Sequence, residues 1–308
     1  MNSEKSKSPL VSIITINYKQ LLLTIDLIKS LKEITYPNYE LVIVENNSQE
    51  DLTPIELKFP SVKLIKSSKN LGFAGGNNLG LKQAKGDYIL YLNNDTIVEK
   101  SFLEPLVNCF IENPNTGLVS PKIRYYDERN RIQFAGYTDL SKITLRNSII
   151  GYGEIDKNQF NKRTKTAFSH GAAMMTTRKI LNQSGLMSEL YFLYYEELDF
   201  GIRIRKLGFD IYYEPSSLIY HKESVSTGKN SPFKTYYLAR NRILYLRRHM
   251  RGIRFSIGLA YQLIVALPKN IFVFLIKLEF KHIQSYIKGL IWNITNPAKG
   301  TLHTNQDL

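Results

Sequence analysis

Short apolar runs alternate with segments of helical periodicity between residues 11 and 92, and this alternation limits the fold to a narrow class. Val11–Asn17 is a nearly continuous run rich in β-branched residues, which is typical of a strand buried on both faces. From Leu21 to Ile34 apolar residues recur at helical spacing, and Pro37 follows. Because strands and helices alternate, we predict an α/β domain with a mostly parallel central sheet and helices on both faces. Further strands of this sheet are predicted at Tyr39–Glu45, Val62–Ser67 and Tyr88–Leu92.

The chain is less regular after this region. A helix is predicted over Phe102–Ile111, and a strand begins at Gly117. Arg124–Lys165 is polar, aromatic and irregular, which indicates an antiparallel excursion or a loop. Order returns at Ala167–Thr177, and a later strand, Asp210–Tyr213, leads to Ile219-Tyr220-His221.

Polar side chains follow three of the predicted strands. Asn17, Glu45 and Asp95 stand at or just beyond strand ends, and in parallel α/β sheets ligands bind outside the carboxyl ends of the strands. Asn70–Gly80 is rich in glycine and asparagine and is predicted to be a turn leading into a short helix. Such a turn lets backbone N–H groups approach a phosphate, and a carboxylate such as Asp95 can hold a divalent cation. Together these features predict a site for a nucleoside diphosphate.

Three acids open a later amphipathic helix. Glu196, Glu197 and Asp199 follow the apolar and aromatic run Tyr191–Tyr195. The acids could simply complement the helix dipole, with Asp199 pairing Arg203 one turn on. Alternatively, the apolar run could desolvate a carboxylate and raise its pKa, as a general base requires. His221 ends a strand downstream, where a histidine is either an ordinary polar residue or a ligand of the divalent cation.

Charge is concentrated at the end of the chain. Of the net charge of +14, residues 229–299 carry thirteen Lys and Arg against one acid, Glu279. We therefore predict a catalytic domain over residues 1–228 and a basic helical extension over residues 229–308, with an anionic partner. The single Cys109 excludes an intramolecular disulfide, which fits a reducing compartment. The polar stretch Met1–Lys7 does not resemble a signal peptide.

The extension contains two apolar runs, Ile257–Leu267 and Ile271–Leu278, separated by Pro268-Lys269-Asn270. Neither reaches the roughly 20 residues that a membrane-spanning helix needs. Two structures remain open for these runs. They could be helices that lie in the membrane interface, or helices that pack on the catalytic domain.

Five separated motifs stand out along the chain: Val42–Ser48, Asn70–Gly80, Leu92–Thr96, Tyr194–Phe200 and the later His221. In order and spacing they resemble the family 2 glycosyltransferases, especially their rhamnosyltransferase-like branch, over about Ser8 to Arg248. The resemblance implies a GT-A fold, which is a Rossmann-like sheet covered by helices, and an inverting mechanism. It also implies a nucleotide-sugar donor of the UDP or dTDP type and a Mg²⁺ or Mn²⁺ ion.

The resemblance assigns roles to individual residues. Asp95 matches the last carboxylate of the metal-binding DXD-type motif, which begins here with Asn93, and His221 is the second expected metal ligand. Glu197 matches the catalytic base, with Glu196 and Asp199 as neighbouring candidates. Glu45 occupies the position that contacts the nucleotide base or ribose. The other residues expected at the nucleotide sugar are Thr15, Asn17, Asn47, Asn70, Gly72, Asn77, Asn78, Asn94 and Gly171.

These assignments predict an enzyme that moves a sugar to a glycan or a lipid-linked glycan during surface polysaccharide synthesis. It would be cytoplasmic, with an anionic membrane surface as partner at the inner face of the plasma membrane. Two alternatives remain. A nucleotidyltransferase would need a basic glycine-rich loop after the first strand, where Asn17-Tyr18-Lys19-Gln20 stands. A nucleic-acid-binding protein would use the basic extension but would leave Asp95 and Glu197 unexplained, so we expect no nucleic acid as partner.

Overall fold

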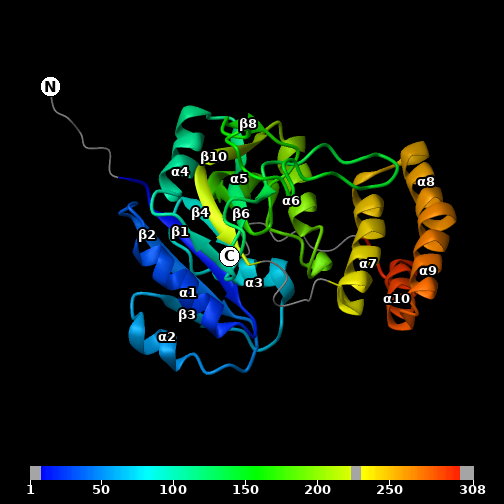
Figure 1. Cartoon of the computed structure of the whole chain (residues 1–308), viewed down its shortest axis with the longest axis horizontal. Helices are drawn as coiled ribbons and strands as arrows, with labels where there is room; N and C mark the ends of the chain where they lie inside the picture. The colour runs from blue at the N-terminus through cyan, green and yellow to red at the C-terminus, as the bar shows by residue number, and fades with distance from the viewer. Residues whose placement is uncertain (1–7, 223–229, 299–308) are drawn as a thin grey trace.

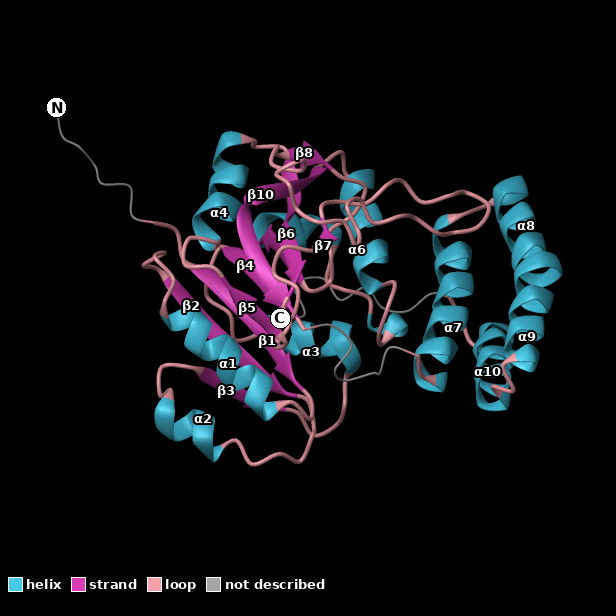
Figure 2. Ribbon diagram, viewed as in Figure 1, coloured by secondary structure: helices cyan, strands magenta, loops and turns pink. Residues whose placement is uncertain are grey.

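The computed structural model describes residues 8–222 and 230–298. A single mixed sheet runs through this part of the chain in the order β3-β2-β1-β4-β9-β6-β10-β5, with β7 beside β6 and β8 beside β10 (Figures 1 and 2). The first four strands of this order are parallel to one another, whereas β9 and β5 are antiparallel to their neighbours. The strands are β1 (Val11–Asn17), β2 (Tyr39–Glu45), β3 (Lys63–Lys66), β4 (Tyr88–Leu92), β5 (Thr96–Val98), β6 (Thr116–Tyr125), β7 (Ile132–Phe134), β8 (Thr164–Lys165), β9 (Ala173–Thr177) and β10 (Asp210–His221).

Helices cover both faces of the sheet, as predicted (Figure 2). Side chains of α1, α2 and α4 pack on one face, and side chains of α3, α5 and α6 pack on the other. Neighbouring residues of β1 point to opposite faces, so Ile13 joins the first core and Ile14 the second. The helices are α1 (Leu21–Lys32), α2 (Thr53–Lys58), α3 (Gly72–Leu81), α4 (Leu103–Glu112), α5 (Arg178–Ser184) and α6 (Glu196–Lys206), with a 3₁₀ turn, η1, at Glu189–Tyr191.

Most predicted elements are confirmed, and the exceptions lie in the second half of the sheet. The irregular region Arg124–Lys165 contains the short strands β7 and β8 and isolated antiparallel bridges. In Ala167–Thr177 only the end is a strand, β9. The strand predicted from Asp210 continues to His221 as one element, because a bulge between Glu214 and Leu218 keeps it paired with β6.

The prediction that the two apolar runs of the extension form separate helices, each too short to span a membrane, was wrong. Gly252–Ile276 is one continuous helix of 25 residues, made of α8 (Gly252–Ala260), the π-helical turn η2 (Tyr261–Ala266) and α9 (Leu267–Ile276). Pro268 has no N–H to donate, and the π-helical turn just before it absorbs the interruption. By length and composition this helix could cross a membrane.

The remaining helices of the extension are α7 (Pro232–His249) and α10 (Phe280–Thr295), which pack against each other. Gly289 of α10 lies so close to α7 that a Cβ there would be 2.6 Å from the carbonyl oxygen of Tyr236. The predicted domain boundary at residues 228 and 229 falls outside the described residues.

Candidate functional site

The ends of β1 and β4 are tied together by side chains. Thr24 of α1 donates its hydroxyl to Oδ1 of Asn17 at 2.8 Å and accepts a hydrogen bond from Nδ2 of Asn94 at 3.0 Å. The predicted convergence of polar strand ends is therefore present. Asn17 and Asn94 are both buried, and each bonds to the Thr24 hydroxyl through its side chain. Thr15 is buried within β1, and its hydroxyl has no hydrogen-bond partner among the described residues.

The end of β2 is folded onto its own turn. The carboxylate of Glu45 accepts hydrogen bonds from the backbone N–H groups of Asn47 and Ser48 and from the Ser48 hydroxyl. Glu50 joins this turn to α1, because its carboxylate accepts from the Asn17 amide at 2.8 Å and from the N–H groups of Gln20 and Leu21. In this arrangement Glu45 shapes the loop with its carboxylate, and Asn47 at φ +60° forms its tip.

The glycine-rich segment is not the open phosphate turn that its composition predicted. It is helical from Gly72 onwards, and the first backbone donors of α3 already have protein acceptors. The N–H of Leu71 is bound by Asn46, the N–H of Gly72 by Asn70, and the N–H of Phe73 by the carbonyl of Phe192 at 2.7 Å. These three donors are therefore not available to a phosphate.

Tight packing explains the glycines of α3. Gly72 has φ +68°, and a Cβ there would lie 2.2 Å from the carbonyl oxygen of Phe192. A Cβ on Gly76 would lie 2.7 Å from Ile16 of β1. The two asparagines predicted at the nucleotide also bond inwards: Asn77 to the carbonyl of Phe73, and Asn78 to the carbonyl of Met187 and to Glu189. The segment thus positions the 187–192 region rather than presenting a row of free donors.

Asp95 and His221 form the pair predicted to hold a metal ion. Oδ1 of Asp95 lies 3.0 Å from Nε2 of His221, and Nδ1 of the same ring lies 2.9 Å from Oε1 of Gln133. Burial opposes ionisation of Asp95, but the neighbouring His221 and Lys222 outweigh it and lower the pKa of the carboxyl. His221 also lines a pocket of about 550 Å³ whose wall includes Tyr126 and Lys222. The Asp95 carboxyl is therefore held in its ionised form, and the neighbouring His221 stands at the edge of a cavity.

A row of aromatic rings leads from this pair to the acids of α6. The His221 ring meets His170 edge to face, with centroids 6.2 Å apart, and His170 stacks on Tyr137 at 6.1 Å. Burial, and then the charge of the Glu197 carboxylate, raises the pKa of the Tyr137 hydroxyl, so Tyr137 lies within electrostatic range of Glu197. Gly171 follows His170 and faces open space, since a Cβ there would meet nothing within 4 Å. Asn93, at the end of β4, binds Ala172 through its backbone.

Glu196 and Glu197 are adjacent carboxylates at the start of α6. Oε2 of each is buried and has no hydrogen-bond partner in the described structure. Burial, then the charge of Glu197, raises the pKa of Glu196 well above its usual range. Burial likewise raises the pKa of Glu197, against backbone hydrogen bonds that lower it. Such a pair is suited to accept and hold a proton near neutral pH.

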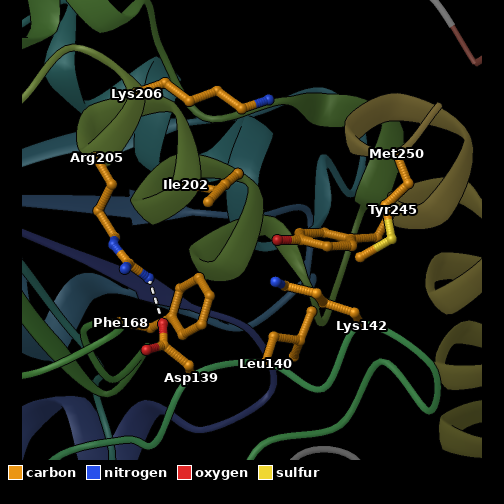
Figure 3. A pocket seen from close by; sticks show the side chains of 9 residues that line it. All are labelled: Asp139, Leu140, Lys142, Phe168, Ile202, Arg205, Lys206, Tyr245 and Met250. Carbon is orange, nitrogen blue, oxygen red and sulfur yellow. Dashed lines mark hydrogen bonds and ion pairs between the residues drawn. The ribbon is translucent and has the colours of Figure 1, made fainter. Parts of the chain in front are cut away.

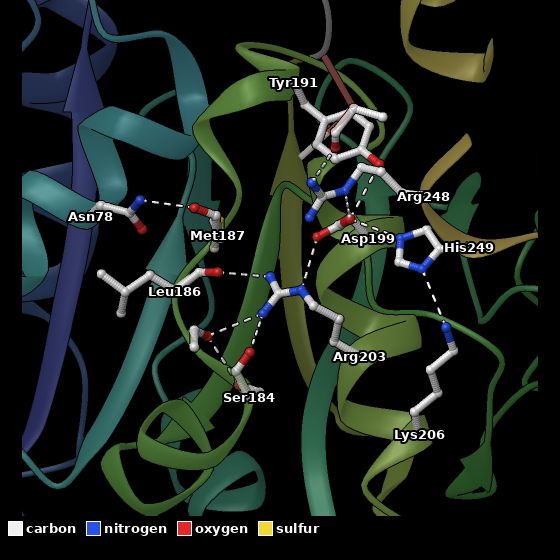
Figure 4. Close-up of polar contacts among 12 residues, drawn as sticks. Asn78, Ser184, Leu186, Met187, Tyr191, Asp199, Arg203, Lys206, Arg248 and His249 are labelled. Carbon is white, nitrogen blue, oxygen red and sulfur yellow. Dashed lines mark hydrogen bonds and ion pairs between the residues drawn. The ribbon is translucent and has the colours of Figure 1, made fainter. Parts of the chain in front are cut away.

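Asp199, the third acid proposed as a base, has a different role (Figure 4). Its carboxylate is fully buried and lies 2.9 Å from Nε of Arg203, 2.9 Å from Nε of Arg248 and 2.8 Å from Nε2 of His249. Burial alone would raise the pKa of Asp199, but His249 and the two arginines outweigh it and hold the pKa well below its usual range. The structure therefore corrects the assignment: Asp199 joins α6 to α7 and is not placed as a proton acceptor.

The loop before Glu196 is held in an unusual conformation. Phe192, Tyr194 and Tyr195 all have positive φ values, between +63° and +74°. Asn241 of α7 donates its side-chain amide to the carbonyls of Tyr191, Leu193 and Tyr194 at 3.0, 2.7 and 2.7 Å. The helix α7, which was predicted to belong to the extension, thus supports the loop that leads into Glu196 and Glu197.

A second pocket, of about 370 Å³, opens at the far end of α6 between Asp139, Phe168 and Tyr245 (Figure 3). Arg205 pairs with Asp139 across it at 2.8 Å. None of the residues that line it was predicted to be in the site. The candidate site therefore does not include this pocket. It comprises the Asp95 and His221 pair, beside the larger pocket, and the acids at the start of α6.

The sequence profile described as "Glycosyl transferase family 2" matches residues 12–185, which is more than half of the 308 residues. The chain belongs to glycosyl transferase family 2. The matched residues include Asp95 and Gly171, whereas the acids of α6 follow the matched region. The resemblance that the five motifs indicated is thereby confirmed.

Several relatives of this family 2 chain carry names. The dTDP-rhamnosyl transferase RfbF of Shigella flexneri is 25% identical and is matched over 86% of this chain and 89% of its own length. The low-salt glycan biosynthesis hexosyltransferase Agl10 of Haloferax volcanii is 27% identical, with 76% and 74% covered. The uncharacterized protein y4gI of Sinorhizobium fredii is 25% identical over 86% of this chain, but the chain spans only 30% of that protein's length.

Solved structures show that this family 2 chain has the GT-A fold. GalNAc-T7, in a crystal structure with UDP, GalNAc and Mn²⁺, superposes with a TM-score of 0.61 at 14% identity, covering 76% of this chain and 48% of that one. The mannosyltransferase PcManGT from Pyrobaculum calidifontis, in complex with GDP-Man and Mn²⁺, gives a TM-score of 0.56 at 15% identity, covering 94% and 88%.

Sequence reasoning missed several residues of this family 2 site. Gln133 and Tyr137 lie in the region that was read as irregular, so no periodic pattern marked them. His170 stands directly before the predicted Gly171, and this neighbour could have indicated that His170 belongs to the site. Asn241 carries no signal of its own, because its role depends on a loop about fifty residues away.

Proposed function

We propose that this chain transfers a sugar from a nucleoside-diphosphate donor of the UDP or dTDP type to a hydroxyl group of a glycan or lipid-linked glycan. One observation supports the proposal most. Two acidic centres, Asp95 with His221 and Glu196 with Glu197, lie at separate positions: His170 contacts His221 and stacks on Tyr137, and Tyr137 lies within electrostatic range of Glu197. Sugar transfer needs these two functions at separate positions, one at the leaving diphosphate and one at the acceptor hydroxyl.

The Asp95 and His221 pair fits Mg²⁺ or Mn²⁺ when the donor is present. A carboxylate oxygen and an imidazole nitrogen 3.0 Å apart offer two ligands, and no group of three or more such side chains occurs in residues 8–222 and 230–298. Ions of this kind are commonly held by one or two side chains together with substrate phosphates. When bound, the ion would supply Lewis-acid stabilisation of the leaving diphosphate. Gln133 fixes the orientation of the His221 ring.

Glu197 is the proposed base, and Glu196 is its protonated neighbour. Oε2 of Glu197 has no partner in the described residues, and its raised pKa lets it take the proton of an acceptor hydroxyl. A mechanism with one base and no protein nucleophile leads to inversion at the anomeric carbon. Because Glu196 cannot easily carry a charge beside Glu197, it stays protonated and leaves Glu197 as the ionised member.

The relatives support a deoxyhexosyl or hexosyl donor. One is named for dTDP-rhamnosyl transfer and another for hexosyl transfer in glycan biosynthesis. We propose on this basis that the chain acts in surface polysaccharide synthesis, on the cytoplasmic side of the plasma membrane. The buried, unpaired Cys109 is compatible with that reducing compartment.

The test is a screen of UDP and dTDP sugars with Mn²⁺, read first as a rise in melting temperature and then as nucleotide release. Asp95→Ala should abolish the stabilisation by donor and metal. Glu197→Gln should keep the stabilisation and lose the transfer. The anomeric configuration of the product, read by NMR, tests inversion. Retention of configuration, or full activity of Asp95→Ala, would overturn the proposed roles.

A further inference from the structure

We propose that the helix Gly252–Ile276, together with the outer face of α10, binds an anionic phospholipid surface and lies in the plane of the membrane interface. Figure 1 shows α8 and α9 along the edge of the molecule farthest from α1 and α2. The inference does not depend on the proposed sugar transfer, because it follows from the exposure, charge and packing of this edge alone.

The exposure of this edge is the first observation. Only 11% of the apolar window of Gly252–Ile276 is buried, although the helix has the composition of a buried or membrane-embedded segment. Large side chains are exposed along it and along the neighbouring α10. They are Ile253 (72%), Ile257 (45%), Ile264 (73%), Phe272 (63%), Ile276 (67%), Phe280 (61%), Ile291 (50%) and Ile294 (83%).

Charge is the second observation, and it selects the occupant. Between residues 251 and 298 there are six Lys and Arg and a single acid, Glu279. All six cations are exposed, and none has an ion-pair partner within residues 8–222 and 230–298. Exposed cations interleaved with exposed apolar side chains match a surface of anionic headgroups above acyl chains. The six are Arg251, Arg254, Lys269, Lys277, Lys281 and Lys288.

The packing of the inner face fixes the orientation. Gln262, near the midpoint of the helix, is 2% exposed and donates its side-chain amide to the carbonyl of Thr144 at 3.2 Å. Gly258 lies against α7, where a Cβ would be 2.8 Å from Cδ1 of Leu246. The helix therefore runs alongside the catalytic part of the chain instead of projecting from it.

This packing argues against a transmembrane orientation. If the helix crossed a bilayer with these contacts intact, the loop at Thr144 would enter the hydrocarbon core, where its backbone groups would lack partners. A helix that lies in the interface keeps the loop in water and presents only the outer side chains to lipid. Length and composition alone would permit either orientation, so the contact of Gln262 decides between them.

The binding test uses sedimentation of the full chain with vesicles of phosphatidylcholine alone and of equimolar phosphatidylcholine and phosphatidylglycerol. The chain should bind the anionic vesicles and lose affinity as salt is raised. Ile257→Glu, Ile264→Glu and Phe272→Glu combined should weaken binding on the order of a hundredfold. Lys269→Glu with Lys277→Glu should weaken it roughly fivefold or more for each site. The matched control is Leu22→Glu with Leu57→Glu, two side chains that are 76% exposed on α1 and α2.

Orientation is tested with single cysteines. In a Cys109→Ser background, Ile253→Cys and Ile276→Cys place a thiol at either end of the helix. A membrane-impermeant maleimide added outside the vesicles should label the two thiols to the same extent if the helix lies in the interface, and only one of them if it crosses. Protection of one end would overturn the orientation.

Three results would overturn the lipid assignment. They are failure to bind anionic vesicles, binding that the three glutamate substitutions leave unchanged, and a solution dimer that these substitutions convert to a monomer without any lipid binding. The last result would assign the face to a second copy of the chain. Because no result depends on sugar transfer, failure here leaves the proposed function to be judged separately.

Discussion

The acids in the first turn of α6 have opposite pKa shifts on the two sides of the helix. On the side towards Tyr137, Oε2 of Glu196 and Oε2 of Glu197 are buried without a hydrogen-bond partner among the described residues, and burial raises the pKa of both carboxyls. On the side towards α7, Asp199 is buried against Arg203, Arg248, His249 and Tyr191, and its pKa is lowered (Figure 4). Burial is common to both, so the presence of counter-charges decides which carboxylate is left reactive.

On the mechanism proposed above, one side contributes stability and the other moves the proton. A buried carboxylate oxygen without a hydrogen-bond partner costs free energy of folding, and such a cost is typical of functional sites. Asp199, by contrast, is fixed by groups from two helices and anchors the turn on which Glu197 stands. The predictions below separate these two functions.

The largest expected effect is on transfer by Glu197→Gln. Loss of the base should lower kcat by about 10² to 10⁴ while the melting temperature stays the same or rises, because an unpartnered buried carboxylate has been removed. Steady-state kinetics and thermal unfolding measure the two quantities. Glu33→Gln, whose side chain is 68% exposed, is the matched control. If Glu196→Gln instead gave the larger loss, the base would be Glu196.

The counterpart on the other side is Asp199→Asn. It leaves Arg203, Arg248 and His249 around a neutral amide, and breaking one member of such a buried group costs about 3–5 kcal/mol. Urea unfolding should show this loss, and the residual activity of the folded fraction should exceed that of Glu197→Gln. An unchanged midpoint in urea would contradict the structural role of Asp199.

An intermediate effect is expected for Asn241→Ala, which removes the donor to three carbonyls of the strained loop. The loss of stability should be about 1–3 kcal/mol. Displacement of the carboxylates should lower kcat by about ten- to a hundredfold, with little change in the KM for the donor. Asn293→Ala, another buried asparagine with two carbonyl acceptors, is the control and should reduce stability but not kcat. Equal kcat losses in both variants would exclude a specific positioning role.

The smallest effect is in the dependence on pH. Burial raises the pKa of Glu197 from 4.5 to about 7, so kcat should rise with pH through that value as the base ionises. The same shift means that Glu197 opposes folding increasingly as pH rises between these two values, because the unfolded state releases the proton more easily. Asp199 acts in the other direction: its stabilisation is present above its ordinary pKa of 3.8 and is lost as pH falls towards its lower folded pKa. A pH profile of kcat and of unfolding measures both, and Glu197→Gln should lack the rising limb.

Sequence reasoning recovered the parallel half of the fold well. β1, β2 and β4 begin and end at the predicted residues, because continuous β-branched runs bounded by turn residues have few alternatives. The pairing of Asn17 with Glu45 at the ends of β1 and β2, and the link from Asn17 through Thr24 to Asn94 beyond β4, followed from the direction of parallel strands. The pairing of Asp199 with Arg203 was also within reach, since the two residues are one helical turn apart.

What could not be predicted depends on contacts distant in sequence. The sequence does not show whether the amide of Asn78 points to a ligand or to Met187, which is more than a hundred residues away. Nor does it show that Arg248 and His249 contact the Asp199 carboxylate, because in the sequence these two residues are only part of a basic segment. The glycines of α3 were misread for the same reason: their partners on β1 and near Phe192 are tertiary neighbours.

The π-helical turn Tyr261–Ala266 has a consequence for the phase of the helix that contains it. A turn with i→i+5 hydrogen bonds holds one residue more than an α-helical turn, so the residues after it lag by about 100° in rotation. In an uninterrupted α-helix, Phe272 and Ile276 would be turned about 100° away from Ile253 and Ile257. By this rotation the lag brings all four round to one stripe. Removing a single residue from this turn would therefore twist the two halves of the stripe out of line.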